Sequence, residues 1–323
     1  MTGGSTAMDR RAVLRAFGAL GLLAAVPACA SPFAGRSLTV ATGRASGVYF
    51  ALGTALAQAW AEQLDLGVAP AVLSTAGSVD NLARLASGAA DVVFSQVDTA
   101  ADHQSRVGPA EPAALRALAR IYDDVVHVVV PASSPVTTLP ELRGARVSLG
   151  EPDSGVIFVV TRLLRSAGLA PGTDLVAEHL GIDGSVAALR EGRIDAFFWS
   201  GGLPTQGITD LAAALPIRLL NLEDMLEPVR LDHAEYAPGT VPAATYGIPE
   251  PITTLLVRNF LLVRAEMADD LARALVDTLF RAQAKLAQAS RAALTIDLRA
   301  AIGTQPVPLH PGAERFYREA KDS

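Results

Sequence analysis

The chain has 323 residues, a formal net charge of −6 and one cysteine. Single cores usually stop growing at about 250 to 300 residues, so this length favours two lobes over one large domain. The acidic balance, with no long Lys/Arg block in the sequence, removes the electrostatic basis for binding nucleic acid. A single cysteine also excludes an intramolecular disulfide and any multi-cysteine metal site.

The first 29 residues have the order of an export signal. Arg10 and Arg11 precede an apolar run over 16–26, and small residues and Cys29 follow. The arginine pair is similar to a twin-arginine signal, and "VPAC" resembles a lipobox, whose cysteine becomes lipidated. The apolar run is short for a membrane span of about 20 residues. We therefore expect a periplasmic protein with lipid attachment at Cys29, the alternative being an uncleaved N-terminal anchor.

A linker over residues 30–37 leads into alternating strands and helices. "SLTVA", "VAPAVLS" and "DVVFSQ" are predicted strands, and an apolar stripe from Tyr49 to Trp60 predicts a helix after the first. Ser78 is a predicted N-cap for a helix that stops at Gly88. A further helix is expected around 113–119, before the β-rich run "DVVHVVVPASSP". This order predicts an α/β protein with largely parallel sheets.

The second half repeats the alternation. Strands are predicted in "ARVSLG", "DLVAEHLG" and "IDAFFWSGG", helices over 155–167 and 186–190, and a loop over 238–251. The run "ITTLLVRNFLLVRAE" suits two buried strands or one return crossing, and helices over 268–288 and 313–320 follow. One lobe is thus expected to contain residues 38–128 and 252–323, and the other residues 129–251. Two crossings predict a hinge near 125–130 and 253–263, with ligand in the cleft between the lobes.

Polar residues follow the predicted strands, where open α/β sheets bind ligands. They are Thr42, Ser46 and Tyr49; Ser74 to Asn81; Gln96 and Asp98; Asp153 to Gly155; and Ser200 to Pro204. Hydroxyls and helix N–H groups suit a small anion or polar ligand. Purely structural roles remain as alternatives: Ser78 as a cap, Tyr49 in the core, and Gln96 bonded to neighbouring backbone.

Four segments in this order resemble the TAXI-family solute receptors, the extracytoplasmic binding proteins of tripartite ATP-independent periplasmic (TRAP) transporters. They are "TGRASGVYFALGTALA", "STAGSVDNLARLASGAADVVFSQVDTA", "EPDSGVIFVVTRLLRSAGL" and "RIDAFFWSGGLP", and they span roughly residues 38–204. The resemblance implies a two-lobed periplasmic binding fold of type II, each lobe a mainly parallel sheet flanked by helices. It also implies a small carboxylate as solute, such as glutamate or a related dicarboxylate, and a TRAP-type membrane permease as partner.

By position, the resemblance also implies the ligand-binding residues. They are Thr42, Gly43, Ser46, Gly47, Tyr49, Thr75, Gly77, Ser78, Asn81, Gln96, Ser154 and Gly155. Val156 and Ile157 depart from the family, which often has threonine and then a basic residue there. Arg44 stands where relatives commonly carry glycine, and either pairs with a ligand carboxylate or points to solvent at the cleft rim.

Signals for other functions are weak. None of the five histidines has metal-ligand spacing with another, and no nucleotide loop or nucleophile elbow occurs in the sequence, so we predict no metal, no cofactor and no catalytic residue. Asp123 and Asp124 are adjacent, so on a strand they face opposite sides and cannot form a catalytic dyad; hinge or surface roles are expected. The alternatives to a transport receptor are a sensor input for a membrane signalling partner and a hydrolase-like enzyme with a dispersed triad.

Overall fold

The computed structural model describes residues 1–2, 31–107, 111 and 114–321. Most of the predicted export signal, including Cys29, lies outside the described residues. In the part of the chain that is described, no helix combines the length and the apolar character needed to cross a membrane.

Ten strands of the described chain form one mixed sheet in the order β2-β1-β3-β10-β4-β7-β5-β6, with β8 paired to β4 and β9 to β10. Their bounds are β1 Thr39–Ala41, β2 Ala71–Leu73, β3 Val92–Gln96, β4 Leu115–Pro131, β5 Arg146–Ser148, β6 Val176–Glu178, β7 Ala196–Gly201, β8 Ile217–Leu219, β9 Ala237–Val241 and β10 Ile252–Arg264. Parallel pairs lie towards both ends of the sheet, β1 with β2 and β3, and β5 with β6 and β7. The central strands β4 and β10 are antiparallel to their neighbours. The predicted α/β class is confirmed.

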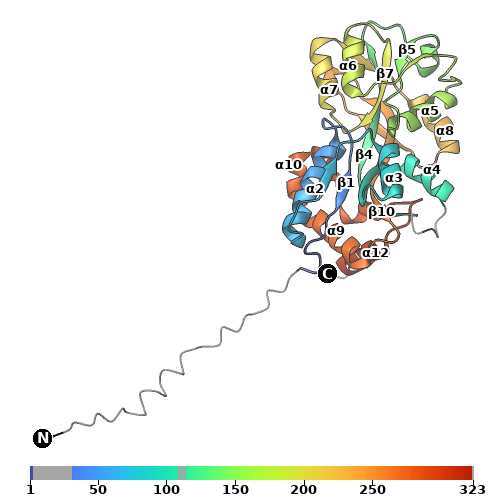
Figure 1. Ribbon diagram of the computed structural model, residues 1–323. Helices are drawn as coiled ribbons and strands as arrows, with labels where there is room; N and C mark the ends of the chain where they lie inside the picture. Colours follow the sequence, from blue (N-terminus) through green and yellow to red (C-terminus); the bar gives the residue numbers. More distant parts are fainter. Residues whose placement is uncertain (3–30, 108–110, 112–113, 322–323) are drawn as a thin grey trace.

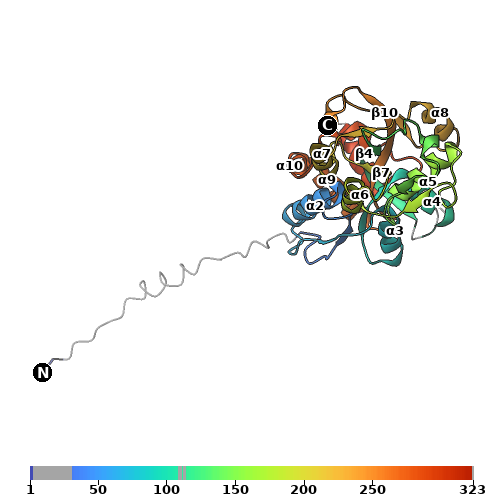
Figure 2. The same ribbon diagram turned by 90° about the horizontal axis from the view of Figure 1, so that it is seen from above.

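Helices surround this sheet when it is viewed from above (Figure 2). Their bounds are α2 Val48–Leu64, α3 Ser78–Ser87, α4 Val97–Val107, α5 Val156–Ser166, α6 Ile182–Arg190, α7 Gln206–Ala214, α8 Glu223–Asp232, α9 Asp269–Arg281, α10 Gln283–Ala289, α11 Leu298–Ala301 and α12 Pro311–Lys321. Short 3₁₀ turns occupy Leu139–Leu142, Thr245–Gly247 and Arg291–Thr295. Amphipathic stripes, such as Leu271, Leu275 and Leu279 of α9, direct each helix's apolar face inward.

The elements form two groups joined by the long strands β4 and β10 (Figure 1). The lower group contains α2, α3, α9 and α12, and the upper group contains α5, α6, α7 and α8. Strand β4 pairs with β10 from Leu115 to Val125 and then with β7 from Val125 to Val129. Because both long strands run from one group into the other, they are the natural axis for a relative rotation of the two groups.

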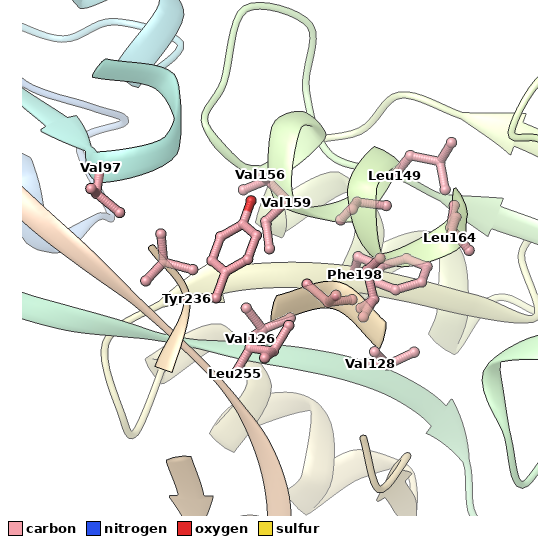
Figure 3. Packing of buried hydrophobic residues seen from close by; sticks show 14 of the residues in the cluster. Val97, Val126, Val128, Leu149, Val156, Val159, Leu164, Phe198, Tyr236 and Leu255 are labelled. Carbon is pink, nitrogen blue, oxygen red and sulfur yellow. The ribbon is translucent and has the colours of Figure 1, made fainter. Parts of the chain in front are cut away.

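The core continues through this junction. One apolar cluster includes Val97 of α4, Val126 of β4 and Leu255 of β10, together with Val159 of α5 and Phe198 of β7 (Figure 3). A second cluster packs α2 and α9 against the other face in the lower group, around the fully buried Trp60. The two groups therefore share one continuous core on one face of the sheet, while each keeps apolar contacts of its own.

Two sequence-based predictions of elements were wrong, and one helix was missed. The helix expected around 113–119 is absent from 115 onward, where the chain is already in β4, because pairing with β10 overrides the helix propensity of its alanines and leucines. The loop expected over 238–251 contains most of β9, which pairs with β10 from Ile252 to Leu256. Helix α4, directly after β3, was not predicted. The run "ITTLLVRNFLLVRAE" forms a single strand, β10, so the one-crossing alternative is confirmed.

Candidate functional site

A cavity of about 270 Å³ lies between the two groups of elements. Its lining comes from the segments after β1, β2, β5 and β6, and from the last residues of β3 and β7. Both parallel parts of the sheet thus direct the carboxyl ends of their strands at one space, the position where ligands bind in open α/β sheets.

Five helices begin at this cavity. Their first residues, which all line it, are Val48 of α2, Ser78 of α3, Val156 of α5, Ile182 of α6 and Gln206 of α7. Within the described chain, no side chain caps the N-terminus of any of these five helices. Uncapped first-turn N–H groups and the positive ends of the helix dipoles favour an anion.

Ten of the thirteen predicted ligand residues line the cavity. They are Gly43, Arg44, Ser46, Gly47, Tyr49, Gly77, Ser78, Gln96, Ser154 and Gly155. The other three lie behind its wall: Asn81 donates from Nδ2 to Phe94 O at 2.8 Å and also to Thr42 O, and Thr75 Oγ1 lies 2.7 Å from Asn81 Oδ1. Thr42, Thr75 and Asn81 therefore hold the loops of the wall in place and do not face the cavity.

Ser78 does not cap its helix, contrary to the prediction. The N-cap of α3 is Gly77, whose φ of 130° lies in a region that favours glycine. The buried Ser78 hydroxyl instead accepts a hydrogen bond from the backbone N–H of Gln96 at 3.0 Å. Ser78 thereby joins the start of α3 to the end of β3.

Arg44 makes an ion pair within the protein that the sequence did not predict. Its Nε donates to Glu151 Oε2 at 2.9 Å, and its Nη2 also contacts the Glu151 carboxylate. Arg44 belongs to the loop before α2 and Glu151 to the loop after β5, so the bidentate pair links the two groups across the cavity. The side chain of Arg44 remains 54% exposed, which places the pair at the rim.

The floor of the cavity is a buried polar cluster of Gln96, Asp124 and Ser200. Gln96 Nε2 donates to Asp124 Oδ2 at 2.7 Å and to Ser200 Oγ at 2.8 Å. Gln96 Oε1 and Asp124 Oδ1 are buried and have no hydrogen-bond partner of good geometry. Burial raises the pKa of Asp124 to about 6, although Gln96, Asn259, Tyr122 and Ser200 partly offset the rise.

Tyr49 belongs to both the core and the cavity. Its ring lies 5.1 Å from that of Phe94, and its hydroxyl donates to Asn259 Oδ1 of β10. Asp98, predicted to converge on the ligand, does not line the cavity; it accepts a hydrogen bond from Tyr236 Oη at 2.7 Å elsewhere in the junction. The prediction that polar residues after a strand face the ligand was therefore wrong for Asp98, because α4 begins directly after Gln96 and turns the next side chains away from the cavity.

Sequence reasoning missed several lining residues. Asp124 and Glu151 were given no place in the site, and the starts of α6 and α7 were not connected with it. Asp124 carried one usable signal, an acidic residue at the head of the apolar run "DVVHVVV". As for metals, no group of three or more His, Cys, Asp or Glu side chains in the described residues could hold an ion.

Known proteins similar to this chain share its fold. The profile of the NMT1-like family matches residues 40–320. The periplasmic aliphatic sulphonate binding protein SsuA of Escherichia coli is 16% identical, with a TM-score of 0.50 over 88% of this chain and 83% of that one. XAC2383 of Xanthomonas citri, bound to chloride ion, is 16% identical, with a TM-score of 0.52 over 88% and 96%. An ancestral arginine-binding protein is 14% identical, with a TM-score of 0.51 over 79% and 98%. The predicted type II periplasmic binding fold is confirmed.

Proposed function

This chain belongs to the NMT1-like family, and from its fold and its cavity we propose that it is an extracytoplasmic solute-binding receptor. It captures a small carboxylate between its two lobes and delivers it to a membrane permease. The role is binding and delivery, without a chemical step. In this proposal the chain is periplasmic and is held at the membrane by a lipid on Cys29.

The observation that carries the proposal is the convergence of five uncapped helix starts on one cavity. Each start offers N–H donors and a dipole equivalent to about half a positive charge, so an anionic group is bound without a lysine or arginine counter-ion. The cavity's volume of about 270 Å³ suits a small organic acid.

The binding step is closure about β4 and β10, with lobes of residues 38–128 plus 252–323 and of residues 129–251. Contacts across the cavity support this arrangement: the Asp80 N–H donates to Asp153 O at 3.1 Å, and Gln96 Nε2 donates to Ser200 Oγ. A Cβ on Gly155 would overlap Gln96 Oε1, so glycine permits this close approach. The structure therefore has the geometry expected of a closed receptor.

The proposed partner is a TRAP-type permease, on the strength of the TAXI-like motifs. Among proteins of similar fold, a putative L-cystine ABC transporter protein of Listeria monocytogenes gives the competing partner class. Uptake driven by an ion gradient and insensitive to ATP depletion would support the TRAP-type partner. Uptake that needs ATP hydrolysis would replace it with an ABC-type permease and leave the receptor role intact.

The test of the receptor role is native mass spectrometry of the purified protein, followed by calorimetric titration of amino acids, monocarboxylates and dicarboxylates. We expect a co-purifying small acid, and an affinity that Gly155→Ala lowers by about ten-fold or more, equivalent to about 1.4 kcal/mol. Gly172→Ala is the control, since nothing lies within 4 Å of its added Cβ. The absence of any bound or titratable acid would refute the proposed function.

A further inference from the structure

The cavity contains one carboxylate that the protein leaves without a counter-ion. Its charged lining residues, all described, are Arg44, Glu151 and Asp124. Arg44 and Glu151 neutralise each other at the rim. Asp124 is only 3% exposed and makes no ion pair among the described residues. A buried charge of this kind is costly unless a partner compensates it.

Two buried acceptor atoms of the floor residues have no hydrogen-bond partner among the described residues, Asp124 Oδ1 and Gln96 Oε1. The orientation of the Gln96 amide follows from its neighbours, since its nitrogen lies 2.7 Å from Asp124 Oδ2. The reverse orientation would place the amide oxygen against a carboxylate oxygen, where the two would repel. The floor therefore offers acceptors, whereas the five helix starts around the cavity offer donors.

Resting on the proposed function, we propose that Asp124 binds a protonated nitrogen of the solute. The solute is then a zwitterion such as an α-amino acid, with its carboxylate at the helix starts and its ammonium group on the floor. A neutral hydroxyl would fill one acceptor but leave the charge uncompensated. A dicarboxylate would add a second negative charge to a cavity whose lining arginine is already paired.

The remaining cavity wall is compatible with such a solute. Apolar side chains on the upper group line it, among them Leu180, Ile182 and Trp199. The Trp199 Nε1–H is already used, donating to Thr205 Oγ1 at 3.0 Å. These groups pack against carbon and offer no charge, so the solute's two ionic groups are assigned to the helix starts and to Asp124.

The protonation state of Asp124 gives the inference a distinctive pH signature. Five elements face this carboxyl, through Tyr49 of α2, Gln96 of β3, Tyr122 of β4, Ser200 of β7 and Asn259 of β10. Burial raises the pKa of both tyrosines well above their usual value, so they stay neutral, and the nearest cavity charges are the Arg44 and Glu151 pair. Ammonium binding should strengthen as the pH rises through about 6, where Asp124 ionises.

The experiment compares probes that differ only in the amino group, L-glutamate with glutarate and L-leucine with 4-methylpentanoate, together with any co-purifying solute and its deaminated analogue. Calorimetry is run on the purified protein near pH 5 and pH 7.5. Where either compound of a pair binds, we expect the amino acid to bind at least ten-fold more tightly than its amino-free analogue. We also expect the amino acid to bind more tightly at pH 7.5 than at pH 5. Asp124→Asn should abolish this preference. Asp123→Asn, on the opposite face of the same strand, should retain it.

Three results separate failure of this inference from failure of the receptor role. Equal binding of an amino-free analogue, or a co-purifying solute without a protonatable nitrogen, overturns the inference and leaves the receptor intact. Affinity for a carboxylate that rises as the pH falls also overturns it, since a protonated Asp124 would then donate to the anion. No binding by any probe or co-purified solute refutes the receptor role itself. If Asp124→Asn does not fold, the comparison of amino acids with their amino-free analogues on the unmodified chain still tests the inference.

Discussion

Two buried aspartates lie at the junction of the two groups of elements, and the protein treats them differently. Asp98 is 0% exposed, and both of its carboxylate oxygens have partners: Oδ1 accepts from the Thr99 N–H at 2.6 Å, and Oδ2 accepts from Tyr236 Oη at 2.7 Å. Arg162 Nη1 approaches Oδ2 at 4.0 Å and donates to Glu235 at 2.7 Å. Asp124 is almost as buried, but its Oδ1 has no partner.

The difference is that the protein supplies hydrogen-bond partners to both carboxylate oxygens of Asp98 but to only one oxygen of Asp124. The Asp98 carboxylate accepts hydrogen bonds from the Thr99 N–H and from Tyr236 Oη, and these bonds partly offset the burial that raises its pKa. Asp124 lines the cavity; its Oδ2 accepts from Gln96, whereas its buried Oδ1 has no hydrogen-bond partner among the described residues. We therefore expect Asp98 to control folding stability, and Asp124 to control ligand choice at a cost in stability.

The largest effect should come from breaking the completed cluster. Asp98→Ala removes the acceptor of Tyr236 Oη and of the Thr99 N–H, and takes one carboxylate away from Arg162, so we expect the free energy of unfolding to fall by about 3 to 4 kcal/mol. Urea denaturation measures the loss. Asp102→Ala, one turn later on α4 and part of an exposed pair with Arg106, is the control and should cost less than about 1 kcal/mol. A loss below about 1 kcal/mol for Asp98→Ala, as expected for the exposed control, would show that the Asp98 cluster does not stabilise the fold.

The opposite effect is expected at Asp124. Because its folded-state pKa is raised from 3.8 to about 6, the stabilisation from its bound proton is complete below about pH 4 and is lost as the pH rises through about 6. Asp124→Asn should therefore gain stability over the unmodified, ligand-free protein, by roughly 2 to 3 kcal/mol on going from pH 4 to pH 7. Urea melts of both proteins across this range measure the difference.

Asp123→Asn is the matched control for that difference. Asp123 pairs with Arg120 on the other side of β4, so its substitution leaves the cavity carboxylate in place and should give no comparable gain between pH 4 and pH 7. A flat difference for Asp124→Asn would mean that the open carboxylate carries no penalty, and the contrast between the two aspartates would lose its basis.

The smallest effect concerns the rim. Arg44→Gln removes an ion pair that spans the cavity but is largely exposed, so ligand affinity should fall only about two- to five-fold at low salt. The loss should shrink in about 1 M salt, which screens exposed charges. Calorimetric titration at the two salt concentrations checks this, with Arg106→Gln, whose partner lies on its own helix, as the control. A loss of a hundred-fold or more would make Arg44 a direct ligand contact.

Local sequence patterns determined most of the elements and one wall of the site. Runs such as "DVVFSQ" gave β3, the stripe of Tyr49, Leu52 and Leu56 gave α2, and "EPDSG" marked the turn into α5, because periodicity and turn chemistry are properties of neighbouring residues. Ser46, Ser78 and Gln96, which were predicted from the strand ends, line the cavity because strand ends in parallel sheets share an edge, whereas Gly43, Arg44 and Gly47 were implied by the family resemblance.

Tertiary structure alone decided the rest. Whether 115–119 is helix or strand depended on the partner strand β10, more than 130 residues later in the chain. Ser78 became a partner of Gln96 instead of a cap, and Arg44 met Glu151, through contacts that no local pattern encodes. The roles of Asp98 and Asp124 depended on what packs against each carboxylate from the other group. The sequence shows which groups are polar. Only the packing of distant segments decides which of them keep a free hydrogen-bonding position for a ligand.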